Sequence, residues 1–129
     1  MNFTDDDALR RGDDIRIPFT LTITDVNGTE HFLSEVGYTD YKLWFTVKAQ
    51  LSDADNAALF QKTTTASQIV ITNASQNKGY VIINAADTVN CDTETAYWYD
   101  LQIKTTACGI KTCNVGKIEF KADVSRATA

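Results

Sequence analysis

Apolar and polar side chains alternate along much of this chain with a period of two. From Ile15 to Ile23 every odd position is apolar, whereas the even positions hold arginine, proline and threonine. This alternation is typical of a β-strand that buries one face against a core. Because proline has no N–H group for a strand ladder, Pro18 predicts that this strand lies at the edge of a sheet.

Six further strands follow from patterns of the same kind. Clear alternation or short apolar runs predict them over residues 41–49, 67–72, 80–83, 96–104, 110–113 and 117–124. Strands and helices do not alternate along the chain, so a parallel sheet built from strand–helix–strand units is not expected. About seven strands at this spacing predict an all-β fold, an antiparallel β-sandwich.

Only one stretch of the chain has the pattern of a defined helix. Ser52 or Asp53 is a suitable N-cap residue, and the alanine-rich segment that follows predicts one short helix near residues 54–60. Residues 85–88 predict a turn or a single helical turn before a loop. The helical content expected from the sequence is therefore very small.

The composition places these elements in a single domain. A chain of 129 residues fits one core, and 43% hydrophobic and 22% charged residues are typical of a globular protein. We expect a flexible N-terminal arm over residues 1–11, one β-sandwich domain over 12–125 and a C-terminal tail over 126–129.

Charge and hydropathy argue against several classes of partner. The net charge of −5 argues against nucleic-acid binding, which needs a basic surface. No apolar run approaches the ~20 residues that cross a bilayer, so no membrane partner is expected. Residues 1–7 are polar and acidic and lack the apolar region of a secretory signal. We therefore expect the protein to be made and kept in a cytoplasm until it is assembled elsewhere.

Candidate catalytic chemistry is sparse in this sequence. A serine or cysteine nucleophile needs a histidine that is held by a carboxylate. The chain has one histidine, His31, which follows a predicted tight turn and is expected to be an exposed turn residue. The acidic clusters at 5–7, 13–14 and 53–55 lack the spacing of a calcium-binding loop. We therefore expect no enzymatic activity, no cofactor and no metal site.

The three cysteines are Cys91, Cys108 and Cys113. An odd number of cysteines in a chain that stays in a cytoplasm favours free thiols that fill small apolar gaps. A disulfide between Cys108 and Cys113, across the hairpin predicted at Gly109, stays open as an alternative. The spacing is not C-x-x-C, and the cysteines lie far from His31, so no metal motif is formed.

Large apolar side chains on otherwise polar strand faces form the candidate interaction site. Trp44 and Trp98 fall on the outward faces of their strands, and Tyr80 and Ile82 make a further strand apolar on both faces. Such side chains suggest a contact with another protein chain. The alternative left open is that a loop or the N-terminal arm covers them. The aromatic rings also suit stacking on sugar rings.

The order and spacing of several short segments resemble the short immunoglobulin-like proteins of tailed bacteriophages. The chain is similar to the N-terminal domain of the baseplate upper protein of phages that infect Gram-positive hosts. The resemblance covers residues 10–126 and rests on the ordered segments at 11–13, 25–28, 51–55, 58–63, 69–73, 86–88, 97–104, 116 and 122–126. It implies an immunoglobulin-like β-sandwich and a virion protein that is made in the host cytoplasm.

The resemblance also implies a role without catalysis. Such a module binds other virion proteins in a tail, baseplate or fibre, and self-association into a homo-oligomer is a further expectation. The family often places this domain ahead of a longer fibre, whereas this sequence ends after it, so a capsid decoration protein on the phage head is the alternative. A second alternative is a carbohydrate-binding or adhesion module. The cysteines at 108 and 113 depart from the family pattern, which leaves the geometry of that hairpin open.

Overall fold

The computed structural model describes residues 14–49, 58–88 and 96–120. Their strands are β1 (Ile15–Thr20), β2 (Ile23–Thr24), β3 (Glu30–His31), β4 (Lys42–Lys48), β5 (Phe60–Thr63), β6 (Ile69–Asn73), β7 (Lys78–Ile83), β8 (Ala96–Thr105) and β9 (Gly109–Glu119). A 3₁₀ turn, η3 (Ala74–Gln76), joins β6 to β7, and one helical turn, α1 (Ala85–Thr88), follows β7. The predicted arm over 1–11 and tail over 126–129 lie outside the described residues.

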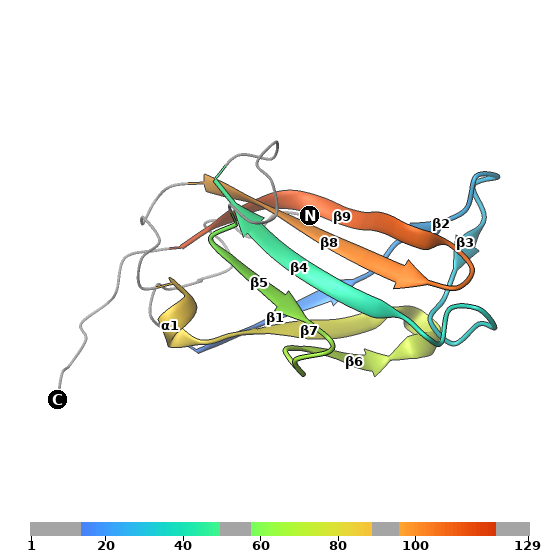
Figure 1. Ribbon diagram of the computed structural model, residues 1–129, viewed down its shortest axis with the longest axis horizontal. Coiled ribbons are helices and arrows are strands. Elements are labelled where there is room, and N and C mark those ends of the chain that lie inside the picture. The colour runs from blue at the N-terminus through green and yellow to red at the C-terminus, as the bar shows by residue number, and fades with distance from the viewer. Residues whose placement is uncertain (1–13, 50–57, 89–95, 121–129) are drawn as a thin grey trace, which may run out of the picture.

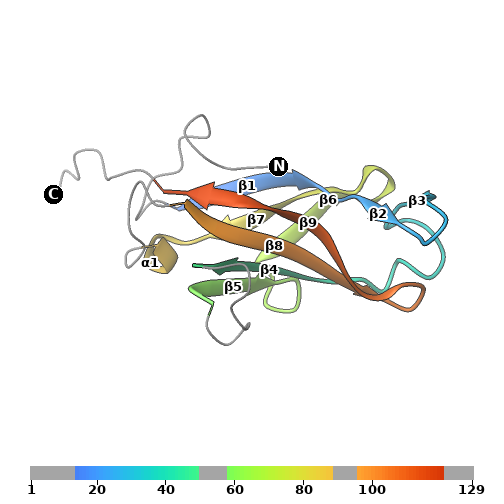
Figure 2. The ribbon, with the colours of Figure 1, turned by 90° about the horizontal axis from the view of Figure 1, so that it is seen from above.

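Two antiparallel sheets form the layers of the fold. One has the strand order β1-β7-β6 and the other β5-β4-β8-β9, and they lie one over the other (Figure 1, Figure 2). β2 and β3 form a separate hairpin at the end of the molecule opposite α1 (Figure 1). The prediction of an all-β antiparallel sandwich is confirmed, and the immunoglobulin-like relationship stays a prediction.

Inward side chains of the two sheets form the core, as the alternation predicts. The buried residues of the long strands include Ile17, Phe19, Leu43, Phe45, Val47, Val81, Ile83, Tyr99, Leu101, Ile103 and Ile118. Phe45 on β4 stacks on Tyr99 on β8, with ring centroids 5.4 Å apart. Burial raises the pKa of Tyr99 to about 12. Each such side chain contributes roughly 1.5–3 kcal/mol when it leaves water, so this layer of side chains holds the sheets together.

The strand predicted from Ile15 to Ile23 has the expected alternation of buried and exposed residues, but it is divided into two strands. β1 ends at Thr20 and β2 begins at Ile23, because the chain leaves its pairing with β7 there and pairs with β3 instead. The alternation continues across the break, since Leu21 and Ile23 are both buried. Pro18 lies on β1, which is an edge strand of its sheet, so the prediction from Pro18 is confirmed.

The predicted helix near residues 54–60 is wrong in its described part. Residues 54–57 lie outside the described residues. Leu59 donates its N–H to the carbonyl of Val47 at 2.8 Å, and Phe60 begins β5 and pairs with Val47. At Leu59 and Phe60, pairing with β4 therefore takes the place of the predicted helix. The helical turn expected at 85–88 is confirmed as α1.

The two strands predicted over 110–113 and 117–124 form one strand, β9, which ends at Glu119. Its register against β8 shifts between Leu101 and Gln102, which face Asn114 and Thr112. Cys113 is therefore the extra residue of a β-bulge. The pairing with β8 continues on both sides of this irregularity.

The outward face of the four-stranded sheet is less exposed than its polar sequence predicts. Thr46, Lys48 and Asp100 are all buried, although the alternation places them away from the core. Lys48 Nζ lies 3.7 Å from Asp100 Oδ2 across neighbouring strands. A pair of opposite charges removes part of the cost of burying either one.

Candidate functional site

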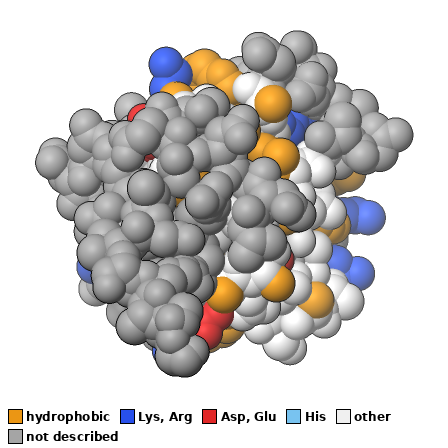
Figure 3. Space-filling model, turned by 90° about the vertical axis from the view of Figure 1, so that its left-hand side faces the viewer, with side chains coloured by type: hydrophobic (Ala, Val, Ile, Leu, Met, Phe, Trp, Pro, Cys, Tyr) orange, Lys and Arg blue, Asp and Glu red, His pale blue; other side chains and the backbone are white. Residues whose placement is uncertain are grey.

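The four candidate interface residues lie on two different faces of the sandwich. Trp44 on β4 and Trp98 on β8 lie on the outward face of the four-stranded sheet, whereas Tyr80 and Ile82 on β7 lie on the outward face of the three-stranded sheet. All four are half-buried. At the end of the molecule that carries α1, the hydrophobic side chains of the described residues also lie in separate small groups (Figure 3). These residues therefore form no single contact patch.

Trp44 borders a shallow hollow of about 290 Å³ on the outward face of its sheet. The hollow is lined by Trp44, Gln61, Gln102 and Ile110. Gln61 Nε2 donates to Thr46 Oγ1 at 3.0 Å, and Gln102 Nε2 donates to Thr112 Oγ1 at 3.4 Å. These two bonds hold the amide groups beside the indole ring, so the hollow combines one aromatic face with two oriented amides.

Trp98 lies on the same face but outside that hollow. It faces Lys48 on β4, whereas Trp44 faces Gln102, so the two tryptophans are four residues apart along the ladder. At about 3.3 Å a residue, this places them on the order of 13 Å apart. Lys117 Nζ lies 5.1 Å from the centre of the Trp98 ring, a cation–π distance. The two rings do not line one groove, which weakens a sugar-binding site built on both.

Tyr80 lies at the middle of the three-stranded sheet under a basic side chain. Arg16 Cζ lies 5.1 Å from the centre of the Tyr80 ring. The neighbouring residue on β7, Gly79, packs so closely that a Cβ atom there would lie 2.3 Å from the carbonyl oxygen of Val70. On the outward face, Arg16 therefore covers part of the Tyr80 ring.

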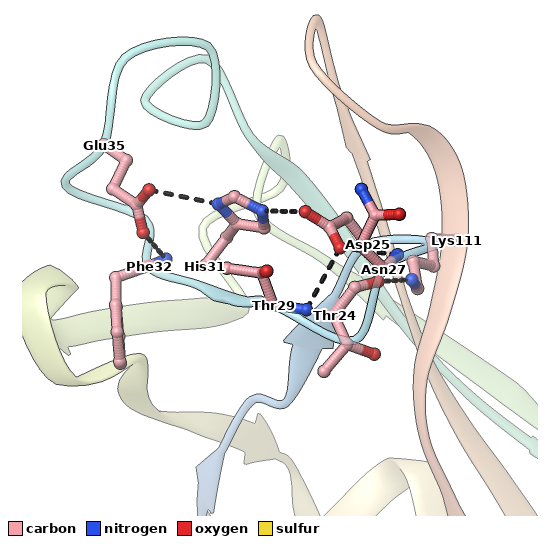
Figure 4. A network of polar contacts seen from close by, with 8 residues as sticks. All are labelled: Thr24, Asp25, Asn27, Thr29, His31, Phe32, Glu35 and Lys111. Carbon is pink, nitrogen blue, oxygen red and sulfur yellow. Dashed lines mark hydrogen bonds and ion pairs between the residues drawn. The ribbon is translucent and has the colours of Figure 1, made fainter.

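His31 is not the exposed turn residue that the sequence predicts. Its Nε2 lies 2.8 Å from Asp25 Oδ2 and its Nδ1 lies 3.1 Å from Glu35 Oε1 (Figure 4). The ring stacks on Tyr38 at a centroid distance of 4.9 Å, and only 21% of the side chain is exposed. The sequence places one carboxylate six residues before His31 and one four residues after it. This spacing alone does not predict the contacts, because the β2–β3 hairpin is what brings the three side chains together.

The cluster of Asp25, His31 and Glu35 is an electrostatic clamp on the β2–β3 hairpin. The hydrogen bonds that His31 donates, first to Asp25 and then to Glu35, raise the pKa of His31, and the same bonds lower the pKa of both carboxyl groups. Asp25 Oδ1 also accepts the N–H of Asn27 at 2.8 Å, which fixes the turn (Figure 4). Both ring nitrogens of His31 face carboxylates, so the arrangement suits holding a loop and not activating a nucleophile.

We expect the stability supplied by this clamp to be greatest between about pH 4.5 and 6.5. The pKa of His31 is raised above 6.5, so its contribution is complete below 6.5 and disappears as pH rises through the raised value. The carboxyl pKa values are lowered from 3.8 and 4.5, so their contribution disappears as pH falls through the lowered values. Urea unfolding of the protein and of His31→Phe across pH 4–9 measures this. A difference between the two that does not vary with pH would contradict the clamp.

The described cysteines are free thiols. Cys108 and Cys113 form no disulfide, and Cys91 lies outside the described residues. Burial raises the pKa of Cys113 to about 12, which makes this thiol a poor nucleophile. Cys108 Sγ lies 3.0 Å from Thr105 Oγ1 at the β8–β9 hairpin. Both thiols pack against the core at its margin.

Within residues 14–49, 58–88 and 96–120, no three His, Cys, Asp or Glu side chains converge as metal ligands would. Within the same ranges, no helix has the length and apolar character of a membrane span. The fold and the site thus define a small antiparallel β-sandwich protein with half-buried aromatic side chains on both outer faces. No protein-family model and no curated protein matches its sequence.

Proposed function

We propose that the protein is a non-enzymatic structural component of a tailed-bacteriophage virion, which binds other virion proteins in the tail, baseplate or fibre. The resemblance of segments over residues 10–126 to the phage immunoglobulin-like proteins supports the virion assignment. A β-sandwich whose aromatic residues are divided between two faces fits a module that contacts more than one neighbour. Capsid decoration is the alternative placement within the same class.

The observation that carries the proposal is the long edge strand β9, with its exposed apolar side chains. This strand has eleven residues and lies at the edge of the four-stranded sheet, whereas the opposite edge strand β5 has four. β9 pairs with β8 from Gly109 to Glu119. Ile110 is 68% exposed and Val115 42% exposed beside this edge. An exposed edge with apolar side chains is a ready surface for strand addition by another chain.

We expect Val115→Lys, which places a lysine opposite Asp100 on β8, to fold normally and to lower incorporation into virions at least tenfold, because a charge beside an edge opposes strand addition. Host cells that produce the phage would express tagged wild-type or variant protein, and the amount in purified particles would be compared. Val26→Lys is the control, since Val26 is fully exposed but lies at the β2–β3 turn. Equal incorporation of Val115→Lys and wild type, or exclusion of wild type from particles, would argue against the proposal.

The position of the protein in a particle reconstruction separates the two placements. Density in the tail or baseplate supports the main proposal, and density on the head supports capsid decoration. Both placements predict a particle-bound protein, so incorporation into particles does not distinguish a tail protein from a head protein.

A further inference from the structure

Two basic side chains face each other directly beside the Trp44 hollow. Lys42 on β4 pairs in register with Lys104 on β8, one outward row away from the pair formed by Trp44 and Gln102. Both lysines are exposed, and neither has an ion-pair partner among the described residues. Like charges directly opposite each other on a sheet destabilise it, so the pairing has no structural advantage of its own.

The two lysines border a second hollow that adjoins the first. It has a volume of about 200 Å³ and is lined by Asp40, Lys42, Lys104, Thr105 and Thr106. Consecutive outward rows of a strand are roughly 6.6 Å apart, so the lysine row and the tryptophan row can contact one small ligand together. Ile110 faces Lys104 across β8 and β9 and lines the Trp44 hollow, which links the two.

Asp40 forms part of the same hollow but is already engaged. Its Oδ1 accepts the N–H of Thr106 at 3.2 Å, and its Oδ2 accepts the Thr106 hydroxyl. These two bonds lower the pKa of Asp40, which therefore stays ionised. Two lysines against one aspartate leave one net positive charge. This balance suits a ligand with a single acidic group and several hydroxyl groups.

We propose that these adjoining hollows bind one acidic sugar unit, with its pyranose ring on Trp44 and its acidic group between Lys42 and Lys104. The C–H face of a pyranose is apolar and packs on an indole ring, and its hydroxyl groups pair with oriented amides. Gln61 and Gln102 each use Nε2 within the protein, so their Oε1 atoms can accept from sugar hydroxyls. Hollows of about 200 and 290 Å³ are small compared with typical ligand sites of roughly 300–1,000 Å³, which limits the site to one or two rings.

The test uses three probes and the intact protein. Trigalacturonic acid supplies a carboxylate, glucose 6-phosphate supplies a phosphate, and maltotriose is the neutral control. Titrations followed by ¹H–¹⁵N NMR are expected to shift the indole N–H of Trp44 and the side-chain amide of Gln102, and to leave the indole N–H of Trp98 unchanged. The acidic probe that binds more tightly identifies the acidic group. Raising the salt concentration from about 0.05 M to 0.5 M is expected to weaken binding, because exposed charges are screened.

Variants separate the two parts of the site. Trp44→Ala is expected to weaken binding of the acidic probe about tenfold, and the double variant Lys42→Gln/Lys104→Gln about tenfold as well. Tyr80→Ala is the matched control, because it removes an aromatic ring from the opposite face and should leave the affinity unchanged. Circular dichroism establishes that each variant is folded. Maltotriose binding as tightly as the acidic probes, no shift at Trp44, or unchanged affinity in the lysine double variant would overturn the proposal.

Discussion

Replacement of Asn77 by alanine is expected to lower the free energy of unfolding by about 3 kcal/mol. Asn77 is 1% exposed and follows η3. Its Oδ1 accepts the N–H of Leu33 at 2.8 Å, and its Nδ2 donates to the carbonyls of His31 at 2.9 Å and Leu21 at 3.4 Å. Alanine leaves these buried groups without a partner, at a cost of about 1–3 kcal/mol for each group that water does not reach.

The backbone of Asn77 adds to this cost. Its φ of 57° is in the left-handed region, which asparagine tolerates better than alanine. Asn77→Gly removes the same hydrogen bonds and relieves the backbone, so it should be about 1 kcal/mol more stable than Asn77→Ala. Urea unfolding with an unchanged m-value is the measurement. A loss below about 1 kcal/mol in Asn77→Ala would show that water or a local shift satisfies these groups.

Asn77 also connects the three-stranded sheet to the clamp at His31. Its side chain holds the backbone of His31 and Leu33, while its own carbonyl accepts the N–H of Leu21 at 2.9 Å. The three contacts join the β6–β7 turn to the place where β1 gives way to β2. Hydrogen bonds of Asn77 therefore stabilise the break between β1 and β2, and the same residue holds the β2–β3 hairpin in place.

The sequence predicts the strands well because burial on one face imposes a period of two that few other structures share. Ile17, Phe19, Leu43 and Ile103 are core residues for this reason, and the edge position of Pro18 follows from its missing N–H. Local propensity was less informative. The alanines before Phe60 favour a helix, but the ladder with β4 decides the structure there.

The contacts of the buried polar side chains could not be predicted from the same pattern. The alternation assigns polar residues to outward positions, yet Asn77 and Lys62 are buried. Their partners lie far away in the chain, so no short-range spacing reveals them. The hollow at Trp44 is similar: the sequence places this ring on an outward face, but the closeness of Lys42 and Lys104 depends on the register of β4 against β8.

The second large effect concerns a buried ion pair between the two layers. Lys62 on β5 faces Phe45, so its side chain is directed inward, and its Nζ lies 2.5 Å from Asp87 Oδ2 on α1. The side chain of Lys62 is 4% exposed and that of Asp87 is 20% exposed. Asp87 Oδ2 also accepts the N–H of Asn84 at 2.7 Å, which caps the helical turn. One carboxylate thus compensates a buried ammonium and fixes α1 against the sheet.

We expect Asp87→Ala to lower the free energy of unfolding by about 3 kcal/mol, because it leaves the ammonium of Lys62 buried without its carboxylate. Lys62→Met should cost less, since a thioether of similar length needs no counter-charge in this position. The double variant Lys62→Met/Asp87→Ala should recover much of the loss, because no buried charge is then left without its partner. Urea midpoints of the four proteins give the coupling between the two sites. If Asp87→Ala costs no more than Lys62→Met, then the ammonium of Lys62 needs no counter-charge and the ion pair is not what stabilises this part of the fold.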